Sequence, residues 1–200
     1  MTLGIKELDR FVKQDLPKLL LERYERHEIL SEADLQAIAY RLVADYLVQQ
    51  DPNRQVFRVF NRLYLKDVHI HPDIVIFKRN KPWVLFELKE RRRRLTVRVA
   101  AKERERLIKA REILRQGGLK TRRGYLIYVA PFGDRRALSG PKGRGARYFF
   151  EVPILLCEHW SDERVKQWTT TFSARAKFKV RFPRTGRPPT RRAPCPEGAK

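Results

Sequence analysis

An aspartate, a glutamate and a lysine stand at the ends of two apolar segments within the stretch HPDIVIFKRNKPWVLFELKE, which runs from His71 to Glu90. The segments IVIF and PWVLF are rich in β-branched and aromatic residues and flank the polar stretch KRNK, so the block predicts a β-hairpin. A turn centred on Asn80 places Asp73 directly opposite Glu87, with their Cβ atoms about 4.5–5.5 Å apart. Lys89 then shares the sheet face of Glu87, because side chains alternate along a strand.

Two carboxylates that face each other across a β-ladder repel, and a cation between them removes the repulsion. Mg²⁺ suits such a pair, because it needs few protein ligands and takes the others from water and substrate phosphate. We therefore expect Mg²⁺ as the cofactor, with Mn²⁺ as a substitute. The lysine adds a positive charge for phosphoryl oxygens or for the attacking water.

The order Pro72-Asp73, followed by Glu87-Leu88-Lys89 on the next strand, resembles the PD-(D/E)xK nuclease superfamily over roughly Ser31 to Val129. The resemblance implies an α/β fold with a restriction-endonuclease-like core, in which helices flank a mixed central β-sheet. It also implies an active site in which Asp73, Glu87 and the Leu88 carbonyl hold Mg²⁺ and Lys89 serves the cleavage of phosphodiester bonds.

A helix is predicted to begin at Ser31, which is capped through Asp34 and followed by the apolar stripe Leu35, Ile38, Ala39, Leu42 and Tyr46. Glu32 shares the inward face at the start of this helix. The superfamily's pattern includes a glutamate on the helix before the strands, and Glu32 matches it as a catalytic and metal-binding residue. A role in the helix dipole alone is an equal alternative, and Glu28 and Asp34 are the competing acids.

Further elements follow from hydrophobic periodicity. Residues Leu3 to His27 predict a helix that is broken or kinked at Pro17. Gln55 to Phe60 and Tyr64 to His71 predict strands, which makes at least three consecutive antiparallel strands with the hairpin. The remaining predictions are a helix over Val99 to Gln116 that stops at Gly117-Gly118, a buried strand over Tyr125 to Val129, a strand over Phe149 to Cys157, and a short helix capped by Ser161.

The chain carries 45 lysines and arginines against 23 acidic residues, a net charge of +22. This excess favours a polyanionic partner, for which we expect nucleic acid, DNA rather than RNA. Four consecutive arginines, Arg91, Arg92, Arg93 and Arg94, leave the strand of Lys89 and are candidate phosphate contacts. The alternating pattern from Phe172 to Phe182 predicts a strand with a cationic face, whose candidate nucleic-acid ligands are Arg175, Lys177, Lys179 and Arg181; an edge strand protected by lysine is the equal alternative.

We expect one nuclease-like domain over residues 31–182, an N-terminal helical segment over 1–30 and a disordered basic tail over 183–200. The apolar run in LPKLLLERY is too short for a membrane span, which favours an intracellular, cytoplasmic protein, with association with the nucleoid in keeping with its charge. Cys157 and Cys195 do not make a disulfide framework or a zinc site.

These observations predict a Mg²⁺-dependent phosphodiesterase, an endonuclease rather than an exonuclease. Two other functions remain open. One is a non-catalytic nucleic-acid-binding protein, in which the carboxylates are structural and the basic surface is the function. The other is a nuclease-fold subunit that cuts only with protein partners, in a restriction, transposition or defence assembly.

Overall fold

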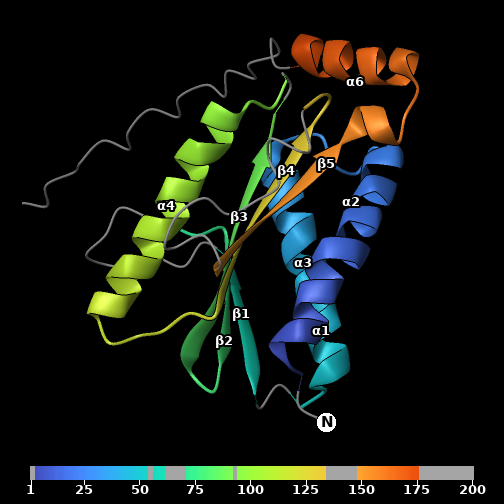
Figure 1. Ribbon diagram of the computed structural model, residues 1–200. Helices are drawn as coiled ribbons and strands as arrows, with labels where there is room; N and C mark the ends of the chain where they lie inside the picture. The colour runs from blue at the N-terminus through green and yellow to red at the C-terminus, as the bar shows by residue number, and fades with distance from the viewer. Residues whose placement is uncertain (1–2, 54–55, 62–70, 92–93, 134–147, 176–200) are drawn as a thin grey trace, which may run out of the picture.

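The computed structural model describes residues 3–53, 56–61, 71–91, 94–133 and 148–175, and within 171–175 it describes the backbone only. Five strands form one mixed sheet with helices on both faces, as the sequence predicted (Figure 1). The elements are α1 (Ile5–Arg10), the π-helical η1 (Phe11–Asp15), α2 (Leu16–Glu25), α3 (Glu32–Gln50), β1 (Phe57–Asn61), β2 (Ile74–Lys78), β3 (Lys81–Glu90), α4 (Val97–Gln116), β4 (Arg123–Ala130), β5 (Phe149–Leu155), the 3₁₀-helical η3 (Leu156–Glu158) and α6 (Asp162–Arg175).

The strands follow each other across the sheet in sequence order, β1-β2-β3-β4-β5. The pairs β1–β2 and β2–β3 are antiparallel, which confirms three consecutive antiparallel strands, although the sequence segments differ from those predicted. The pairs β3–β4 and β4–β5 are parallel, and α4 makes the crossover between β3 and β4. The predicted strand over Tyr64 to His71 falls almost wholly outside the described residues, as does the predicted tail.

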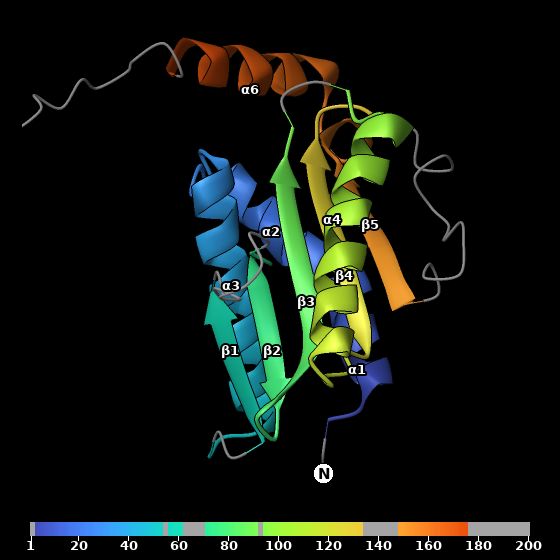
Figure 2. The same cartoon turned by 90° about the vertical axis from the view of Figure 1, so that its left-hand side faces the viewer.

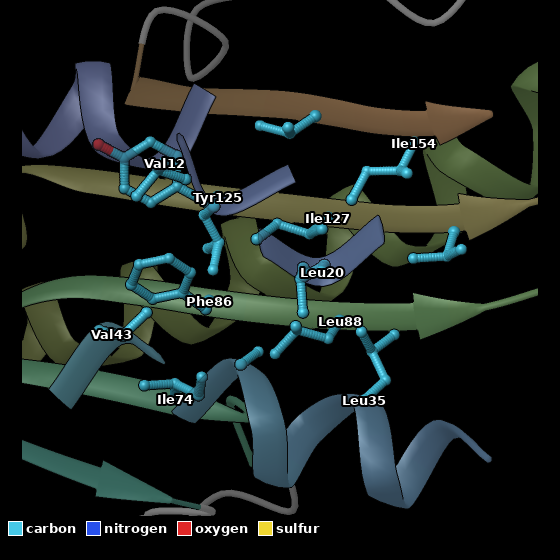
Figure 3. Packing of buried hydrophobic residues seen from close by; sticks show 14 of the residues in the cluster. Val12, Leu20, Leu35, Val43, Ile74, Phe86, Leu88, Tyr125, Ile127 and Ile154 are labelled. Atoms are coloured by element: carbon cyan, nitrogen blue, oxygen red, sulfur yellow. The ribbon is translucent and has the colours of Figure 1, made fainter. Parts of the chain in front are cut away.

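Two hydrophobic cores lie on the two faces of the sheet. Helices α1, α2 and α3 cover one face, and α4 covers the other (Figures 1 and 2). Because β3 is central and covered on both sides, its residues from Pro82 to Leu88 are all buried, which explains the almost continuous apolar run in its sequence. Figure 3 shows Phe86 and Leu88 of β3 packed with Leu20, Leu35 and Val43 in the first core.

The β2–β3 hairpin reaches the predicted register by a different route. Arg79 and Asn80 both have positive φ angles, 50° and 62°, and form a two-residue turn in which Lys78 pairs with Lys81. The predicted turn centred on Asn80 is therefore wrong. An irregularity opposite Ile76/Phe77 then inserts Trp83 into β3, and from that point Ile76 pairs with Val84 and Ile74 with Phe86. The inserted residue restores the pairing that the sequence predicted next to Asp73 and Glu87.

The N-terminal helices follow one continuous helical path. The predicted interruption at Pro17 takes the form of the π-helical turn Phe11–Asp15, which ends just before α2 and leaves the proline in the first turn of α2. A proline inside a regular α-helix lacks one hydrogen bond and its ring clashes with the carbonyl of residue i−4, so the wider π-helical turn directly before Pro17 lies where the α-helical geometry is disturbed. Leu8, Leu16 and Leu20 of this path are fully buried against the sheet.

The crossover helix α4 matches its predicted inward face. Ala100, Leu107, Ala110 and Leu114 are buried, and the helix ends at Gly117, followed by Gly118 with φ at 76°. The helix begins at Val97, two residues earlier than predicted, because the Thr96 hydroxyl caps it by accepting from the Val99 N–H.

The predicted strand from Phe172 to Phe182 is wrong over its first four residues. Residues Phe172 to Arg175 belong to α6, which begins after Ser161 as predicted and continues to Arg175. Adding residues to an existing helix costs less than starting a new strand, and Ser173, Ala174 and Arg175 tolerate a helix despite their alternating pattern. Lys177, Lys179 and Arg181 lie outside the described residues. No helix in the described part of the chain is long and apolar enough to cross a membrane.

The cap of α3 generates a first prediction. The Ser31 hydroxyl accepts from the Asp34 N–H at 3.2 Å and donates to the Asp34 carboxylate at 2.9 Å, which also accepts from the Leu30 N–H. Ser31→Ala should therefore lower the free energy of unfolding by about 1 kcal/mol, and Ser31→Asp should restore most of it. Urea denaturation measures both changes. Thr96→Ala removes a longer and more exposed capping hydrogen bond at α4, so it should lower the free energy of unfolding by less than Ser31→Ala does. A larger loss in Thr96→Ala would contradict this prediction.

Candidate active site

The carboxylates of Asp73 and Glu87 lie side by side at the ends of β2 and β3. Asp73 directly precedes β2, and its N–H donates to the Phe86 carbonyl at 2.9 Å, which extends the strand pairing beyond Ile74. Both residues are buried, with exposed fractions of 6% and 3%. The sheet therefore holds two acids close together and away from bulk water.

Neutral donors fix the carboxylate of Asp73. Its Oδ1 accepts from Nε2 of Gln36 at 2.9 Å, and its Oδ2 accepts from the N–H of Leu88 at 2.8 Å. Sequence reasoning missed Gln36, which is buried on α3 beside the predicted stripe. Its spacing from Glu32 could have indicated it, because a side chain one helical turn after Glu32 lies on the same face of the helix.

Lys89 joins Glu87 to the start of α3. Its Nζ lies 3.1 Å from Oε1 of Glu87 and 3.1 Å from Oε1 of Glu32, whose other oxygen accepts from the Glu90 N–H at 3.4 Å. Figure 2 shows the start of α3 near the end of β3, where these contacts occur. Among the three acids considered, the structure brings Glu32 to this group. Glu28 pairs with Arg23, and Asp34 caps its own helix.

Leu88 lies between the two charged residues on β3, with its side chain fully buried on the opposite face of the sheet. Its N–H donates to Oδ2 of Asp73, as described above. A role of its carbonyl as a metal ligand stays a prediction from the resemblance.

A second group of charges adjoins Glu87 on the α4 side, and of its members the sequence indicated only Arg91. Nη1 of Arg106 lies 3.4 Å from Oε1 of Glu87 and 3.0 Å from Oε2 of Glu103. Glu103 is a buried residue of α4, and its other oxygen accepts from Nη2 of Arg91 at 3.2 Å. An alternating chain of acids and bases therefore runs from Glu32 through Lys89, Glu87, Arg106 and Glu103 to Arg91.

Burial and repulsion determine the protonation of this group. Loss of solvation, followed by the charge of Asp73, raises the pKa of Glu87 to about 7, although Lys89 and Arg106 oppose the shift. Burial alone would lower the pKa of Lys89, but the charges of Glu87, Asp73 and Glu32 outweigh it and raise the pKa. Lys89 is therefore a stable ammonium at neutral pH, whereas a pKa of about 7 leaves Glu87 divided between its protonated and its ionised form there.

Three of the eight predicted nucleic-acid ligands, Arg91, Arg94 and Arg175, lie within the described residues. Arg91 belongs to the charged chain beside Glu87, Arg94 is exposed just after it, and Arg92 and Arg93 lie outside the described residues. Arg175 is the last residue of α6, far along the chain from this site. Comparison of the chain with protein-family models, curated proteins and solved structures gave no match.

The raised pKa of Glu87 predicts a pH-dependent stability. As the pH rises from about 4.5 to about 7, the unfolded chain releases this proton before the folded protein does, so folding stability falls across that window and levels off above it. Glu87→Gln removes the effect. In metal-free buffer with EDTA, the free energy of unfolding of the variant should rise relative to that of wild type by on the order of 3 kcal/mol as the pH increases from about 4.5 to about 7. Denaturant unfolding of both proteins across the window measures it, and a constant difference would contradict the assignment.

Proposed function

We propose that this protein is a metal-dependent nuclease that hydrolyses phosphodiester bonds of nucleic acid, DNA in preference to RNA. The observation that carries the proposal is the meeting of two buried carboxylates, Asp73 and Glu87, with the ammonium of Lys89, which contacts Glu87 and Glu32 at 3.1 Å. Structural ion pairs at a strand end rarely bury like charges beside each other, because the repulsion destabilises the sheet. Perturbed carboxylates in such a group are typical of a catalytic site.

The charge of the group supports a metal and a phosphate together. Four carboxylates, from Glu32, Asp73, Glu87 and Glu103, face three cations, from Lys89, Arg91 and Arg106, which leaves one net negative charge when all are ionised. A divalent cation reverses that sign, and one phosphodiester then makes the whole assembly neutral. The same cation opposes the raised pKa of Glu87, whose largest cause is burial, because it offsets the second cause, the charge of Asp73.

The donors present fit Mg²⁺ or Mn²⁺. The described residues hold no group of three or more His, Cys, Asp or Glu side chains in the arrangement of a metal site. Mg²⁺ takes one or two carboxylates and completes its shell with water and substrate phosphate. Asp73 and Glu87 would hold it, with the Leu88 carbonyl as an additional oxygen. Glu32, which the resemblance also implies as a ligand, contacts Lys89 in this structure and lies beside the group. When bound, such an ion polarises a phosphoryl oxygen and lowers the pKa of a water.

Other groups of the protein have separate roles in positioning Asp73 and in stabilising the charge on phosphate. Gln36 and the Leu88 N–H fix both oxygens of Asp73, so that its orientation does not depend on a ligand. Lys89 stays protonated and serves as a fixed positive charge, which stabilises the charge that develops on phosphate rather than removing a proton from water. The contact with Glu32 keeps the ammonium at the site, since Glu32 begins a capped helix.

The charge of the whole chain supports nucleic acid as the class of substrate. A net charge of +22 attracts a polyanion and increases its association rate at low salt. Cleavage of labelled linear, circular and single-stranded DNA with Mg²⁺, Mn²⁺ or EDTA tests the proposal directly. Binding without cleavage under every condition would favour the non-catalytic alternative, and cleavage that appears only when partner chains are added would favour a subunit of a larger assembly.

Metal binding depends on the paired carboxylates. Asp73→Asn and Glu87→Gln should each weaken Mg²⁺ or Mn²⁺ binding by at least roughly 10–100-fold, because each removes one charged ligand. Calorimetric titration measures the affinity. Glu112→Gln removes a carboxylate on the exposed surface of α4, where it pairs with Arg115, and should leave metal affinity unchanged. Wild-type affinity in both site variants would refute the metal site.

Lys89 is expected to act in the transition state. Lys89→Ala should lower the single-turnover cleavage rate roughly 10²–10³-fold, with a much smaller effect on binding of nucleic acid. Lys89→Arg should not restore the rate, because a planar fork replaces a compact ammonium. Lys6→Ala removes an exposed lysine near the N-terminus and serves as the control. Single-turnover assays with folding checked by circular dichroism measure these rates, and wild-type rates in both Lys89 variants would remove this residue from the mechanism.

A further inference from the structure

We propose that Arg91 and Arg106 form a phosphate clamp, held by the buried carboxylate of Glu103, which grips the nucleic-acid backbone beside the bond to be cut. The inference rests on the proposed function, which it extends from the reacting centre to the neighbouring phosphate. Its subject is a set of three residues, two of which, Glu103 and Arg106, no sequence motif indicated. The class of ligand is a phosphodiester backbone.

The two arginines come from different elements and meet on one acid. Arg91 directly follows β3, and its backbone N–H donates to the Val129 carbonyl of β4 at 2.8 Å, which fixes it to the sheet. Arg106 lies in the middle of α4. Their guanidinium groups contact the two different oxygens of Glu103, Oε1 at 3.2 Å and Oε2 at 3.0 Å. One carboxylate therefore holds two cationic groups side by side.

The exposure of the three side chains shows which charges are available to a ligand. Glu103 is 8% exposed, whereas Arg91 and Arg106 are 39% and 48% exposed. The acid is hidden and the two cations are open, and together they carry one net positive charge. In the described structure, Glu103 and Glu87 engage one terminal nitrogen of each guanidinium, Nη2 of Arg91 and Nη1 of Arg106. The other terminal nitrogen of each guanidinium can donate to phosphate, so that the two arginines together offer two donors to one phosphate.

The position of the clamp connects it to the reacting groups. Arg106 contacts Glu87 at 3.4 Å, so that the clamp and the paired carboxylates share one ion-pair network. A phosphate bound by Arg106 is therefore separated from Glu87 only by the guanidinium that both of them contact. Because neighbouring phosphates of a strand are only several ångströms apart, a backbone held at the clamp places an adjacent phosphate at Glu87 and Lys89.

The surface of α4 continues the clamp as a cationic ridge. Arg98, Lys102 and Lys109 are exposed and are spaced from one another or from Arg106 by three or four residues, so that they lie along the same flank of the helix. One exposed acid, Glu105, lies on the same flank, because it is three residues after Lys102 and four residues before Lys109. With Arg106 the flank therefore carries four bases and one acid, and a backbone that leaves the clamp along it meets net positive charge.

The competing interpretation is structural, with Glu103 joining α4 to β3 and the arginines serving only that joint. Binding measurements separate the two, because a structural joint does not change the number of phosphates contacted. Each lost phosphate contact lowers the slope of log affinity against log salt by about 0.9 on B-DNA. A helix residue on the other flank supplies the matched control. Arg115 is exposed and pairs with Glu112. It lines a pocket together with Tyr148, the residue directly before β5.

The experiment measures fluorescence anisotropy of a labelled DNA duplex of about 30 base pairs with the full chain in EDTA, between about 50 and about 200 mM salt. Arg106→Ala and Arg91→Ala should each lower the slope by about 0.9 and weaken binding roughly tenfold or more. Arg106→Lys should keep the slope but not the full affinity. Glu103→Gln should also keep the slope and weaken binding, because the two charges remain but are no longer held together. Arg115→Ala should have a smaller effect than either clamp variant.

Wild-type slopes in both alanine variants, or an equal loss in Arg115→Ala, would overturn the clamp. Circular dichroism and thermal melting check folding, and the half-exposed Arg106 keeps the test decisive should Arg91→Ala fail to fold. The two proposals fail separately, because this measurement contains no cleavage step. If the wild-type protein never cuts DNA while the two alanine variants show the predicted losses of binding, the nuclease proposal is refuted and the clamp is supported. Normal cleavage with unchanged binding in the variants would do the reverse.

Discussion

The repulsion between Asp73 and Glu87 is the constraint on which the rest of the site depends. Two carboxylates that are buried beside each other are unfavourable unless positive charge and hydrogen-bond donors surround them. The fold supplies these from both of its layers. Helix α3 provides the Gln36 amide on one side of the sheet, and α4 provides the Arg106 guanidinium from the other. Lys89 of β3 completes the group from within the sheet itself.

The elements that look purely architectural therefore have direct electrostatic roles. The Ser31 cap determines where α3 begins, and with it the position of Glu32 over Lys89. The crossover helix α4 buries an apolar face against β3 and β4, which places Glu103 and Arg106 along its edge next to Glu87. Packing energy from the two cores holds charges in positions that their mutual interactions alone would not maintain. In this sense the hydrophobic layers and the charged group form one structural unit.

Local patterns in the sequence were enough to predict the hairpin, the buried strand β4, the inward face of α4 and the convergence of Asp73, Glu87 and Lys89. Each of these depends on residues close in sequence or on strand alternation. Gln36, Glu103 and Arg106 could not be predicted as partners of that group, because their contacts depend on how α3 and α4 pack on the sheet. Residues Phe172 to Arg175 were misassigned because alternation with small residues fits a strand and a helix equally well. The register beside Asp73 was predicted correctly from an incorrect turn.

The inserted Trp83 has a consequence for how the hairpin can change during evolution. The two-residue turn pairs Lys78 with Lys81, and without the insertion that pairing would set Asp73 opposite Phe86 instead of Glu87. A shift of one position exchanges the side chains of a strand between its two faces. A single-residue gain or loss in this hairpin would therefore separate the acids and turn charged groups toward an apolar layer. A change of length that keeps Asp73 opposite Glu87 must therefore be paired: a residue gained or lost at the turn needs an opposite change at the position of Trp83.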